Sequence, residues 1–403
     1  MTLKDITSAR VSDRKVLLRV DFNVPLEGGR ITDDTRVRAH LETIRFLMEN
    51  GAKTALISHL GRPKGKTVAE LSLRPLAGKL KELLGVEVPF IEDCISEDLP
   101  ARLDDIEKGG LILLENTRFH HQEEANDPVF SEKLAAPFDL FVMDAFSASH
   151  RAHASTRGVA DYLPSFAGFL IEKEVRILKT VRDEPQKPLV LVLGGAKVTD
   201  KIGLVENMAK KAAVILIGGA MAFPFMKAAG LSVGHSKCDD ENTVKARYIL
   251  QNTAGTGVEL ILPEDFIVSD APENEIDISV AQARSFPGKL MGLDIGPATR
   301  EEFTRRIASA RSILWNGPMG MFERPAFSEG TKAVGEAVSK QTKKGAMTVL
   351  GGGDTAAAAY SLGFAESVTH VSTGGGASLE FFEGKRLPGL EPLYDEKRGR
   401  TSE

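Results

Sequence analysis

Two chemically different sets of residues occupy the two halves of this chain. In the first half, short apolar runs end in Arg and His, and the motifs are RVDFNVP (19–25), HLGRP (59–63), ENTRF (115–119) and SHRAH (149–153). In the second half, similar runs end in glycines with spaced lysines or acids: GGAKVTDKIG (194–203), WNGPMGMFE (315–323), GGGDT (351–355) and STGGGAS (372–378). Guanidinium and imidazole groups suit a compact polyanion, and glycine loops let the backbone approach a nucleotide. One chain with both sets suggests two substrates held on two lobes that must meet.

The first set has the chemistry of a binding site for a phosphorylated acid. Arg offers a planar pair of donors that Lys cannot copy. A single Arg is usually solvated, but four at the ends of expected strands, with His59 and His153 among them, favour a functional set. The four are Arg36, Arg62, Arg118 and Arg151. Asp21 and Asn23 follow the first apolar run and are placed to accept hydrogen bonds from a substrate hydroxyl. The remaining histidines are interpreted as structural: His40, His120, His121, His150, His235 and His370.

The second set favours phosphate binding by a loop of unusual type. The chain contains neither GxxxxGK[ST] nor GxGxxG, which excludes a P-loop and the common dinucleotide fingerprint. Lys197 and Lys201 are four residues apart, so a helix beginning here would carry both on one face, with its positive end adding to their charge. Asp354 is expected to open a helix and to hold a Mg²⁺ ion brought by a nucleotide, and Glu323 to accept hydrogen bonds from ribose hydroxyls. Any one glycine run could equally be a tight packing turn.

Length and composition indicate a soluble protein of two domains. The 403 residues exceed the roughly 250–300 at which a single core stops growing. A formal net charge of −5 and a pI near 6.0 argue against a general nucleic-acid or anionic-membrane binder. Cys94 and Cys238 have neither disulfide nor zinc spacing, which fits a reducing cytoplasm. The amino terminus lacks the apolar core of a signal peptide and no apolar stretch is long enough to span a bilayer, so we expect cytoplasmic localisation.

The alternation of apolar runs with helical stretches predicts an α/β fold of two lobes. Each lobe is expected to be a mostly parallel β-sheet with helices on both faces (Rossmann-like), and a long interdomain helix is expected to join them. The expected strands are 16–20, 54–57, 111–114, 140–143, 189–193, 214–217, 259–262, 291–295, 312–314, 347–350 and 368–371. Helices are expected at 41–50, 73–84 and 131–136. Ligands bind at the carboxyl ends of parallel strands, where every motif above falls.

The joint between the lobes is predicted from an apolar stripe at helical spacing, followed by the Pro-containing segment DEPQKP (183–188). The stripe consists of Leu170, Ile171, Val175, Leu178 and Val181. The expected division is a first domain at 1–168, a helix and hinge at 169–186, a second domain at 187–387 and a terminal segment at 388–403. A surface helix inside one domain is the alternative for the stripe. The terminal segment is either a disordered tail or a strap that packs back on the first domain, and we expect the strap.

Taken together, the motifs resemble those of the phosphoglycerate kinase family. The eight blocks match that family's signatures in order and spacing from Arg19 to Glu380, and only Thr199 stands where Ser is common. The resemblance implies reversible transfer of the acyl phosphate of 1,3-bisphosphoglycerate to ADP, giving 3-phosphoglycerate and MgATP in glycolysis. It also implies direct in-line transfer on domain closure, in a monomeric cytosolic phosphotransferase with a carboxyl group as acceptor. The first domain would bind phosphoglycerate and the second the nucleotide.

The family's functional residues can be carried over one by one, and none is missing. By similarity, the phosphoglycerate would be bound by Asp21, Phe22, Asn23, Arg36, His59, Leu60, Gly61, Arg62, Arg118 and Arg151. The nucleotide would be bound by Lys201, Gly292, Glu323, Gly352, Gly353, Asp354 and Thr355, with Asp354 near the Mg²⁺. Arg36, Lys197 and the backbone of Gly374, Gly375 and Gly376 would surround the transferring group.

Residue chemistry is consistent with that implied reaction. A carboxylate that attacks ATP is already ionised at pH 7, so no general base is required, and none stands out in the sequence. Two other readings remain. An NAD-dependent dehydrogenase of the same fold class is disfavoured because GxGxxG and its acidic partner are absent. A non-catalytic scaffold is disfavoured because Arg36, Lys197, Lys201 and Asp354 are all present.

Overall fold

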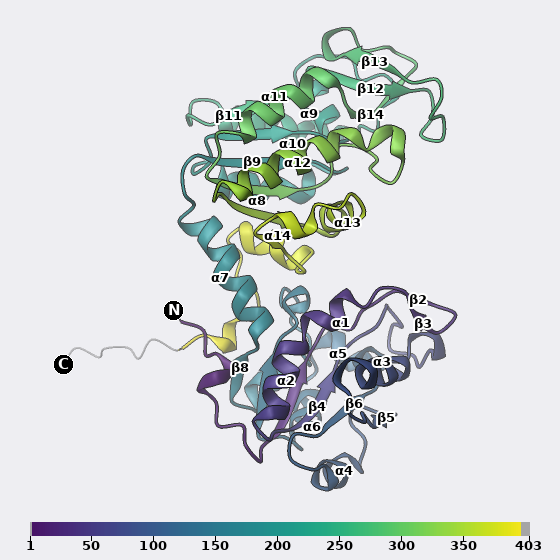
Figure 1. The fold of residues 1–403 in the computed structure, drawn as a ribbon, viewed down its shortest axis with the longest axis vertical. Helices are drawn as coiled ribbons and strands as arrows, with labels where there is room; N and C mark the ends of the chain where they lie inside the picture. The colour runs from purple at the N-terminus through teal and green to yellow at the C-terminus, as the bar shows by residue number, and fades with distance from the viewer. Residues whose placement is uncertain (1, 396–403) are drawn as a thin grey trace, which may run out of the picture. The chain divides into compact units, whose positions relative to one another are not determined.

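The chain folds into two compact units, shown in a computed structural model that describes residues 2–395 (Figure 1). The first unit comprises Met1–Val175 with Arg386–Glu403, and the second comprises Arg176–Lys385. The division falls inside helix α7, Phe169–Asp183. Ile171, Leu178 and Val181 of the predicted stripe are fully buried on this helix, so the helical period read from the sequence is confirmed.

A six-stranded parallel sheet forms the centre of the first unit. Its strand order is β5-β6-β4-β1-β7-β8, and every neighbouring pair is parallel. The strands are β1 Lys15–Arg19, β4 Lys53–Ile57, β5 Phe90–Ile91, β6 Leu111–Leu114, β7 Leu140–Met143 and β8 Ser165–Ala167. β6 and β7 match the predicted ranges, while β1 and β4 each begin one residue earlier. Their continuous apolar runs are buried, as expected for a sheet covered on both faces.

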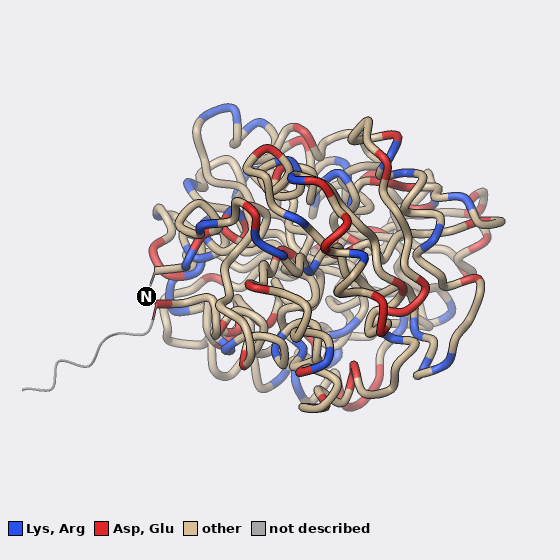
Figure 2. The backbone as a smooth tube through the Cα atoms, turned by 90° about the horizontal axis from the view of Figure 1, so that it is seen from below, with Lys and Arg blue, Asp and Glu red and all other residues tan. Residues whose placement is uncertain are grey.

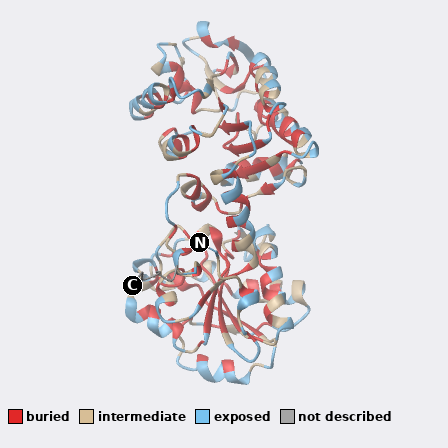
Figure 3. Ribbon diagram, turned by 90° about the vertical axis from the view of Figure 1, so that its left-hand side faces the viewer, coloured by how far each residue is buried: buried red, intermediate tan, exposed pale blue. Residues whose placement is uncertain are grey.

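Helices enclose this sheet, and their outer sides face solvent (Figure 3). They are α1 Thr35–Ala39, α2 Leu41–Glu49, α3 Arg74–Leu84, α4 Leu99–Asp105, α5 His121–Ala125 and α6 Pro128–Ala135, and a small hairpin joins β2 Leu26–Glu27 to β3 Arg30–Ile31. Helix α6 begins three residues before the predicted start at 131. The Asp127 side chain accepts a hydrogen bond from the Phe130 N–H and Pro128 occupies the first turn, which together extend the helix toward its amino terminus.

A second six-stranded parallel sheet forms the centre of the second unit. Its order is β11-β10-β9-β15-β16-β17. The strands are β9 Leu189–Leu193, β10 Val214–Ile217, β11 Glu259–Ile261, β15 Ser312–Asn316, β16 Met347–Gly351 and β17 His370–Val371. The helices of this unit are α8 Ile202–Met208, α9 Ala222–Ala228, α10 Asp240–Thr253, α11 Pro297–Ile307, α12 Glu329–Lys343, α13 Gly353–Ser361 and α14 Gly376–Phe382.

The predicted strand at 291–295 exists but belongs to a different sheet. It is β14, Met291–Ile295, and it pairs antiparallel with β12, Asp265–Ser269, in a three-stranded sheet of order β13-β12-β14. This sheet was not predicted from the sequence. Its outer strand β13, Ser279–Gln282, is mostly exposed and has little apolar character, so it gives no strong strand signal.

The described part of the carboxyl-terminal segment packs on the first unit. The Gly389 N–H donates to the Ser149 carbonyl at 2.8 Å, and the Lys4 N–H donates to the Leu393 carbonyl at 2.8 Å. Up to residue 395 the segment is therefore a strap rather than a tail. The remainder of the predicted segment, 396–403, lies outside the described residues.

Charged residues of both signs are interspersed along the backbone (Figure 2). This distribution agrees with the small net charge of −5. Among residues 2–395, none of the helices combines the length and the apolar character that crossing a bilayer requires.

Candidate functional site

The polar motifs of the first unit follow four strands that are neighbours in its sheet. Asp21 follows β1, His59 follows β4, Arg118 follows β6 and Arg151 follows β7. The order β6-β4-β1-β7 brings these four strand ends side by side at one edge. Parallel pairing therefore gathers residues that are up to 130 positions apart in the sequence, as the motif positions predicted.

The Asp21 carboxylate at this edge is held by two hydrogen bonds. Its side chain accepts hydrogen bonds from the Arg36 guanidinium, at 2.7 Å, and from the Ser147 hydroxyl. Burial opposes ionisation, but the pKa of Asp21 is lowered because the charge of Arg36 and the hydrogen bond from Ser147 favour the carboxylate. The Arg36 side chain remains 43% exposed, so donors beyond the one used by Asp21 are open to solvent.

A buried relay, which the sequence analysis did not find, holds the backbone of Asp21. The Asp21 N–H donates to His40 Nε2 at 2.9 Å, and His40 Nδ1 lies 2.8 Å from Asp144 Oδ2. Because Nε2 accepts, the ring proton is on Nδ1 and is donated to Asp144. The other Asp144 oxygen accepts from the Leu170 N–H in the first turn of α7. His40 is structural, as predicted, and it is also the positioning residue of Asp21.

The loop after β4 is tied to the loops after β1 and β6. The Gly61 N–H donates to Asn23 Oδ1 at 2.9 Å, and Arg118 Nη1 donates to the Gly61 carbonyl at 2.8 Å. Arg118 Nε lies 3.1 Å from Glu124 Oε1, and the Arg118 side chain is 4% exposed. Together with the hydrogen bond to Gly61, this contact fixes the guanidinium in place. Gly61 has φ +62°, and a side chain there would press against Leu71.

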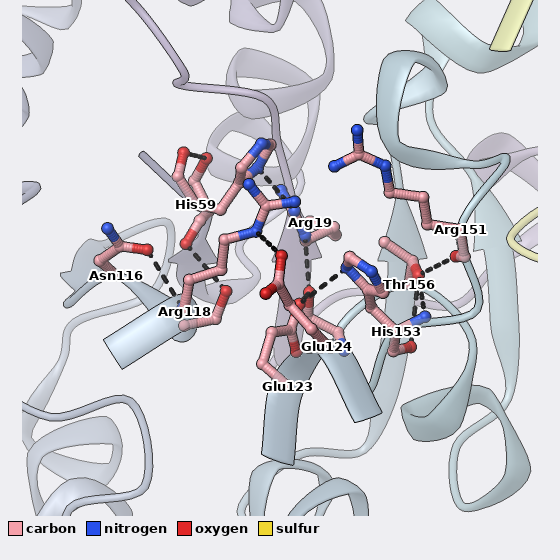
Figure 4. Close-up of polar contacts among 12 residues, drawn as sticks. Arg19, His59, Asn116, Arg118, Glu123, Glu124, Arg151, His153 and Thr156 are labelled. Atoms are coloured by element: carbon pink, nitrogen blue, oxygen red, sulfur yellow. Dashed lines mark hydrogen bonds and ion pairs between the residues drawn. The ribbon is translucent and has the colours of Figure 1, made fainter. Parts of the chain in front are cut away.

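A cluster of charged and polar side chains around Arg19 lies near Arg118 (Figure 4). Arg19 Nε donates to the Ser155 hydroxyl at 2.9 Å, and Arg19 Nη2 lies 3.1 Å from His59 Nδ1. Glu123, which is fully buried, accepts hydrogen bonds from the Ser155 N–H and hydroxyl. Arg19 belongs to the first motif but was not among the predicted site residues, because sequence gives no sign that this Arg is buried.

The two histidines of this edge are neutral at pH 7. Burial and the charge of Arg19 lower the pKa of His59 well below 6.5. Burial and the charges of Arg118 and Arg19 lower the pKa of His153 to about 4. The positive charge of the edge is therefore carried by its arginines.

The other predicted residues of the first unit differ in exposure. Arg62 is exposed and Arg151 is half-buried, with Arg151 Nε donating to His150 at 3.1 Å. The side chains of Phe22 and Leu60, by contrast, lie in the core. Both backbone groups of Leu60 are bonded to the Asn116 amide, so this residue shapes the loop.

In the second unit, a cavity of about 330 Å³ lies at the ends of β9, β15 and β16. Its wall contains both lysines and most of the predicted glycines: Gly195, Ala196, Lys197, Asp200, Lys201, Asn316, Gly317, Gly352, Gly353, Asp354, Thr355, Gly375, Gly376 and Leu379. Gly374 is not part of this wall, and its N–H donates to the Ser372 hydroxyl at 3.1 Å. Asn316, Asp200 and Gly195 were not predicted as site residues.

The two lysines do not share a helix face, so that prediction is wrong. A 3-10 turn covers Thr199–Lys201, and α8 begins only at Ile202. The turn separates their environments: Lys197 is exposed, whereas Lys201 is 8% exposed. Burial lowers the pKa of Lys201, and the carboxylates of Asp200 and Asp354 oppose that shift.

Backbone conformation and close contact explain two of the glycines around this cavity. Gly317 has φ +101°, and a Cβ there would lie 2.3 Å from the Gly194 backbone. The Gly317 N–H donates to the Thr355 hydroxyl at 2.6 Å, so the fully buried Thr355 joins the loop after β15 to α13. Gly352, with φ +91°, precedes that helix.

A second cavity, of about 460 Å³, shares Gly195, Ala196 and Asp354 with the first. Its wall is largely apolar and includes Phe223, Phe266, Met291, Pro318 and Met319. The predicted residues Gly292 and Glu323 line this cavity and not the one that contains Lys197 and Lys201. A Cβ at Gly292 would lie 2.5 Å from the Phe223 ring, which explains the glycine. The apolar walls were missed because nothing in the sequence joins Phe223 to Met319.

Comparison with known proteins identifies the family. The model of the family described as phosphoglycerate kinase matches residues 4–385. The chain belongs to the phosphoglycerate kinase family. Phosphoglycerate kinase of Thermosipho africanus is 48% identical over 399 residues, covering 99% of this chain and 98% of that protein. The enzyme of Synechococcus elongatus is 48% identical over 396 residues, with 98% of each chain covered.

Solved structures of phosphoglycerate kinases have the same fold. That from Coxiella burnetii has a TM-score of 0.88 at 40% identity and covers 97% of this chain and 99% of its own. That from Pyrococcus horikoshii OT3 has a TM-score of 0.81 at 33% identity, with 97% and 98% covered. The activity is therefore that of a phosphoglycerate kinase, a kinase whose acceptor is a carboxyl group. Neither the dehydrogenase nor the scaffold reading gains support.

Proposed function

We propose that the first unit binds the phosphoglycerate and the second binds the nucleotide of a reversible phosphoryl transfer. The products are 3-phosphoglycerate and MgATP when 1,3-bisphosphoglycerate and ADP are the substrates. The pair of joined cavities in the second unit carries the nucleotide assignment. One is apolar and the other is lined by lysines and glycines, and they share Gly195, Ala196 and Asp354. That division matches the apolar base and the charged phosphates of one nucleotide.

The arginine edge of the first unit supports the other assignment. Arg118 is fixed by Gly61 and Glu124, so little rotamer entropy remains to be lost when it binds a phosphate. Arg62 and Arg151 add cationic donors, and Asp21 and Asn23 can bind hydroxyl groups. A small acid with one phosphate and one hydroxyl needs this mixture of donors and acceptors.

The nucleotide is proposed to bring Mg²⁺ with it. Asp354 is exposed, lines both cavities and opens α13, so its carboxylate can reach an ion held mainly by phosphate oxygens. Mg²⁺ prefers one or two carboxylates together with phosphates and water, and this donor set fits. When bound, the ion supplies charge neutralisation along the phosphates.

The residues of the chain would act by positioning and by charge. The acceptor carboxylate is ionised at pH 7, so no side chain needs to remove a proton. We assign Lys197 and Arg36 to the equatorial oxygens of the transferring group, where positive charge stabilises the transition state. Direct transfer requires the two bound substrates to meet in line while water is excluded, because water would otherwise hydrolyse ATP.

A coupled assay tests the assignment. Purified protein with 3-phosphoglycerate, ATP and Mg²⁺ should form acyl phosphate, and chelation of Mg²⁺ should abolish turnover. Asp354→Asn should raise the Mg²⁺ concentration needed for half-maximal rate, whereas Asp240→Asn, an exposed acid paired with Lys227, should not. Absence of turnover in the complete mixture would overturn the proposal. We also propose that the protein acts as a cytoplasmic monomer in glycolysis, which fractionation and sedimentation would test.

A further inference from the structure

Three side chains with metal-binding chemistry meet outside both proposed substrate sites. Asp93, Cys94 and His120 each offer one ligand atom, and these atoms all lie within 4.8 Å of one another. Asp93 and Cys94 follow β5, and His120 follows the 3-10 turn Thr117–Phe119 after β6. The Glu115 N–H donates to the Ile91 carbonyl at 3.0 Å, so β5 and β6 end side by side and deliver these loops together.

Contacts with neighbouring residues orient the side chains of Asp93 and His120. His120 Nε2 lies 2.8 Å from Asp93 Oδ1. The same Asp93 oxygen accepts from the Ile95 N–H at 3.1 Å, and the His120 ring lies 5.1 Å from the Phe130 ring, centroid to centroid.

The sulfur of Cys94 is buried close to acidic side chains. Cys94 is 1% exposed. The negative charges of Asp93, Glu123 and Glu115 act on its thiol, and such charge favours a cation nearby. The side chains of Asp93 and His120 are 46% and 25% exposed, which gives an ion a path from solvent.

We propose that Asp93, Cys94 and His120 form a binding site for a divalent transition-metal ion of the Zn²⁺ class, with water as the fourth ligand. Ligands at about 2.0–2.3 Å in a tetrahedron stand about 3.3–3.7 Å apart, so small side-chain shifts suffice to close this site. A thiolate and an imidazole select zinc-like ions over Mg²⁺ and Ca²⁺, which take oxygen ligands. The proposed site is thus distinct in chemistry from the site of the nucleotide metal.

Binding changes the protonation of two ligands. The thiol of Cys94 loses its proton to solvent, and the resulting thiolate donates its electron pair to the metal. A neutral His120 with its proton on Nε2 shifts that proton to Nδ1 by exchange with solvent, and Nε2 then donates its lone pair to the metal. Affinity therefore increases with pH. The bound ion would cross-link the loop after β5 to the segment Thr117–Phe119, which contains Arg118.

Co²⁺ titration of the chelator-treated protein tests the site, because thiolate coordination gives a charge-transfer absorption that oxygen-bound Co²⁺ lacks. One equivalent should produce this band and Zn²⁺ should remove it. Cys94→Ser should abolish the band, and His120→Asn should weaken Co²⁺ binding by about 10-fold or more. The matched control is Cys238→Ser, which alters the other cysteine, lying beside the acids Asp239 and Asp240, and should retain the band.

Two results would overturn the proposal: no band in the unmodified protein, or a band that survives Cys94→Ser and disappears in Cys238→Ser. Because Cys94 is buried, its variant is also checked by circular dichroism and by kinase turnover. If that variant fails to fold, the decision rests on His120→Asn, whose ring is partly exposed. Unchanged Co²⁺ affinity in the folded His120→Asn protein would exclude the site.

Discussion

The two units offer different physical means of binding an anion. In the first, Arg118 is set by a carbonyl and a carboxylate, and buried Arg19 and Glu123 compensate one another below it. In the second, glycines bring the backbone close to the cavity, and only Lys197 and Lys201 supply positive side-chain charge to its wall. The first arrangement holds protein charges in fixed positions, which suits a small substrate. The second leaves room for a longer substrate. Substitutions in the first unit should therefore act through charge, whereas those in the second unit should act through backbone shape as well as through the charge of its two lysines.

The largest effect is expected where charge is assigned to the transferring group itself. Lys197→Ala and Arg36→Ala should each lower kcat by at least about 10²-fold, roughly 3 kcal/mol, since the interaction they lose is made in the transition state. Steady-state kinetics at saturating substrates measures this. The controls are Arg38→Ala, on the same helix as Arg36 and paired with Asp34, and Lys227→Ala. A near-normal kcat for Lys197→Ala would remove the transition-state role.

Arg118 should affect binding more than turnover. Arg118→Ala should raise KM for 3-phosphoglycerate by about 10- to 100-fold, because a charge-assisted hydrogen bond contributes about 1.5–3 kcal/mol. The value of kcat should change less, since this Arg is assigned to a non-reacting phosphate. Arg118→Lys should restore only part of the affinity. A fall in kcat with constant KM would contradict the assignment.

Adjacent glycines of the second unit allow a matched test of backbone shape. Gly352→Ala should lower the free energy of unfolding by about 1–3 kcal/mol, because φ +91° is strained for a residue with a side chain. Gly353→Ala should be neutral or slightly stabilising, because its Cβ meets nothing within 4 Å and Gly353 lies at the start of α13. Denaturant unfolding of both variants measures the difference. Equal losses would show that strain at Gly352 is not the cause.

The smallest effect concerns Asp294, a carboxylate buried beside the apolar cavity. It accepts from the Gly330 N–H at 2.6 Å and the Ile295 N–H at 2.8 Å, yet burial raises its pKa to about 7. The Asp294 carboxyl group therefore binds its proton more tightly in the folded state than in the unfolded state. The stability that this proton contributes is fully present below about pH 4 and is lost as pH rises through 7. The free energy of unfolding should fall by about 1 kcal/mol between pH 6 and pH 8 through this group.

Asp294→Asn should remove that part of the pH dependence. The comparison uses the change between the two pH values in each protein, so a uniform loss of stability in the variant does not affect it. Thermal or denaturant unfolding at both pH values gives the result. An unchanged difference would mean that Asp294 is ionised throughout this range.

The positions of many parallel strands could be predicted from runs of apolar residues in the sequence. The runs at 111–114, 140–143, 189–193 and 214–217 are continuous apolar segments, and each became a parallel strand with the predicted bounds. The antiparallel sheet was not predicted: β13 is short and exposed, and the apolar segment Asp265–Ser269 of β12 was not recognised as a strand. The helical pairing of Lys197 with Lys201 was wrong, since spacing alone does not reveal that a 3-10 turn occupies Thr199–Lys201.

The site residues divide in the same way. The sequence by itself determined which chemical groups follow which strands, because the carboxyl ends of parallel strands share one edge whatever the intervening loops do. Only the tertiary structure decided which of those groups remain available. The Asn116 amide is hydrogen-bonded to the backbone of Leu60, His40 accepts a hydrogen bond from the Asp21 N–H, and the Cys94 sulfur lies close to the His120 ring. The partners are 19 to 56 positions apart in the sequence. Such partners are set by the packing of strands and loops in three dimensions, and no local pattern in the sequence records them.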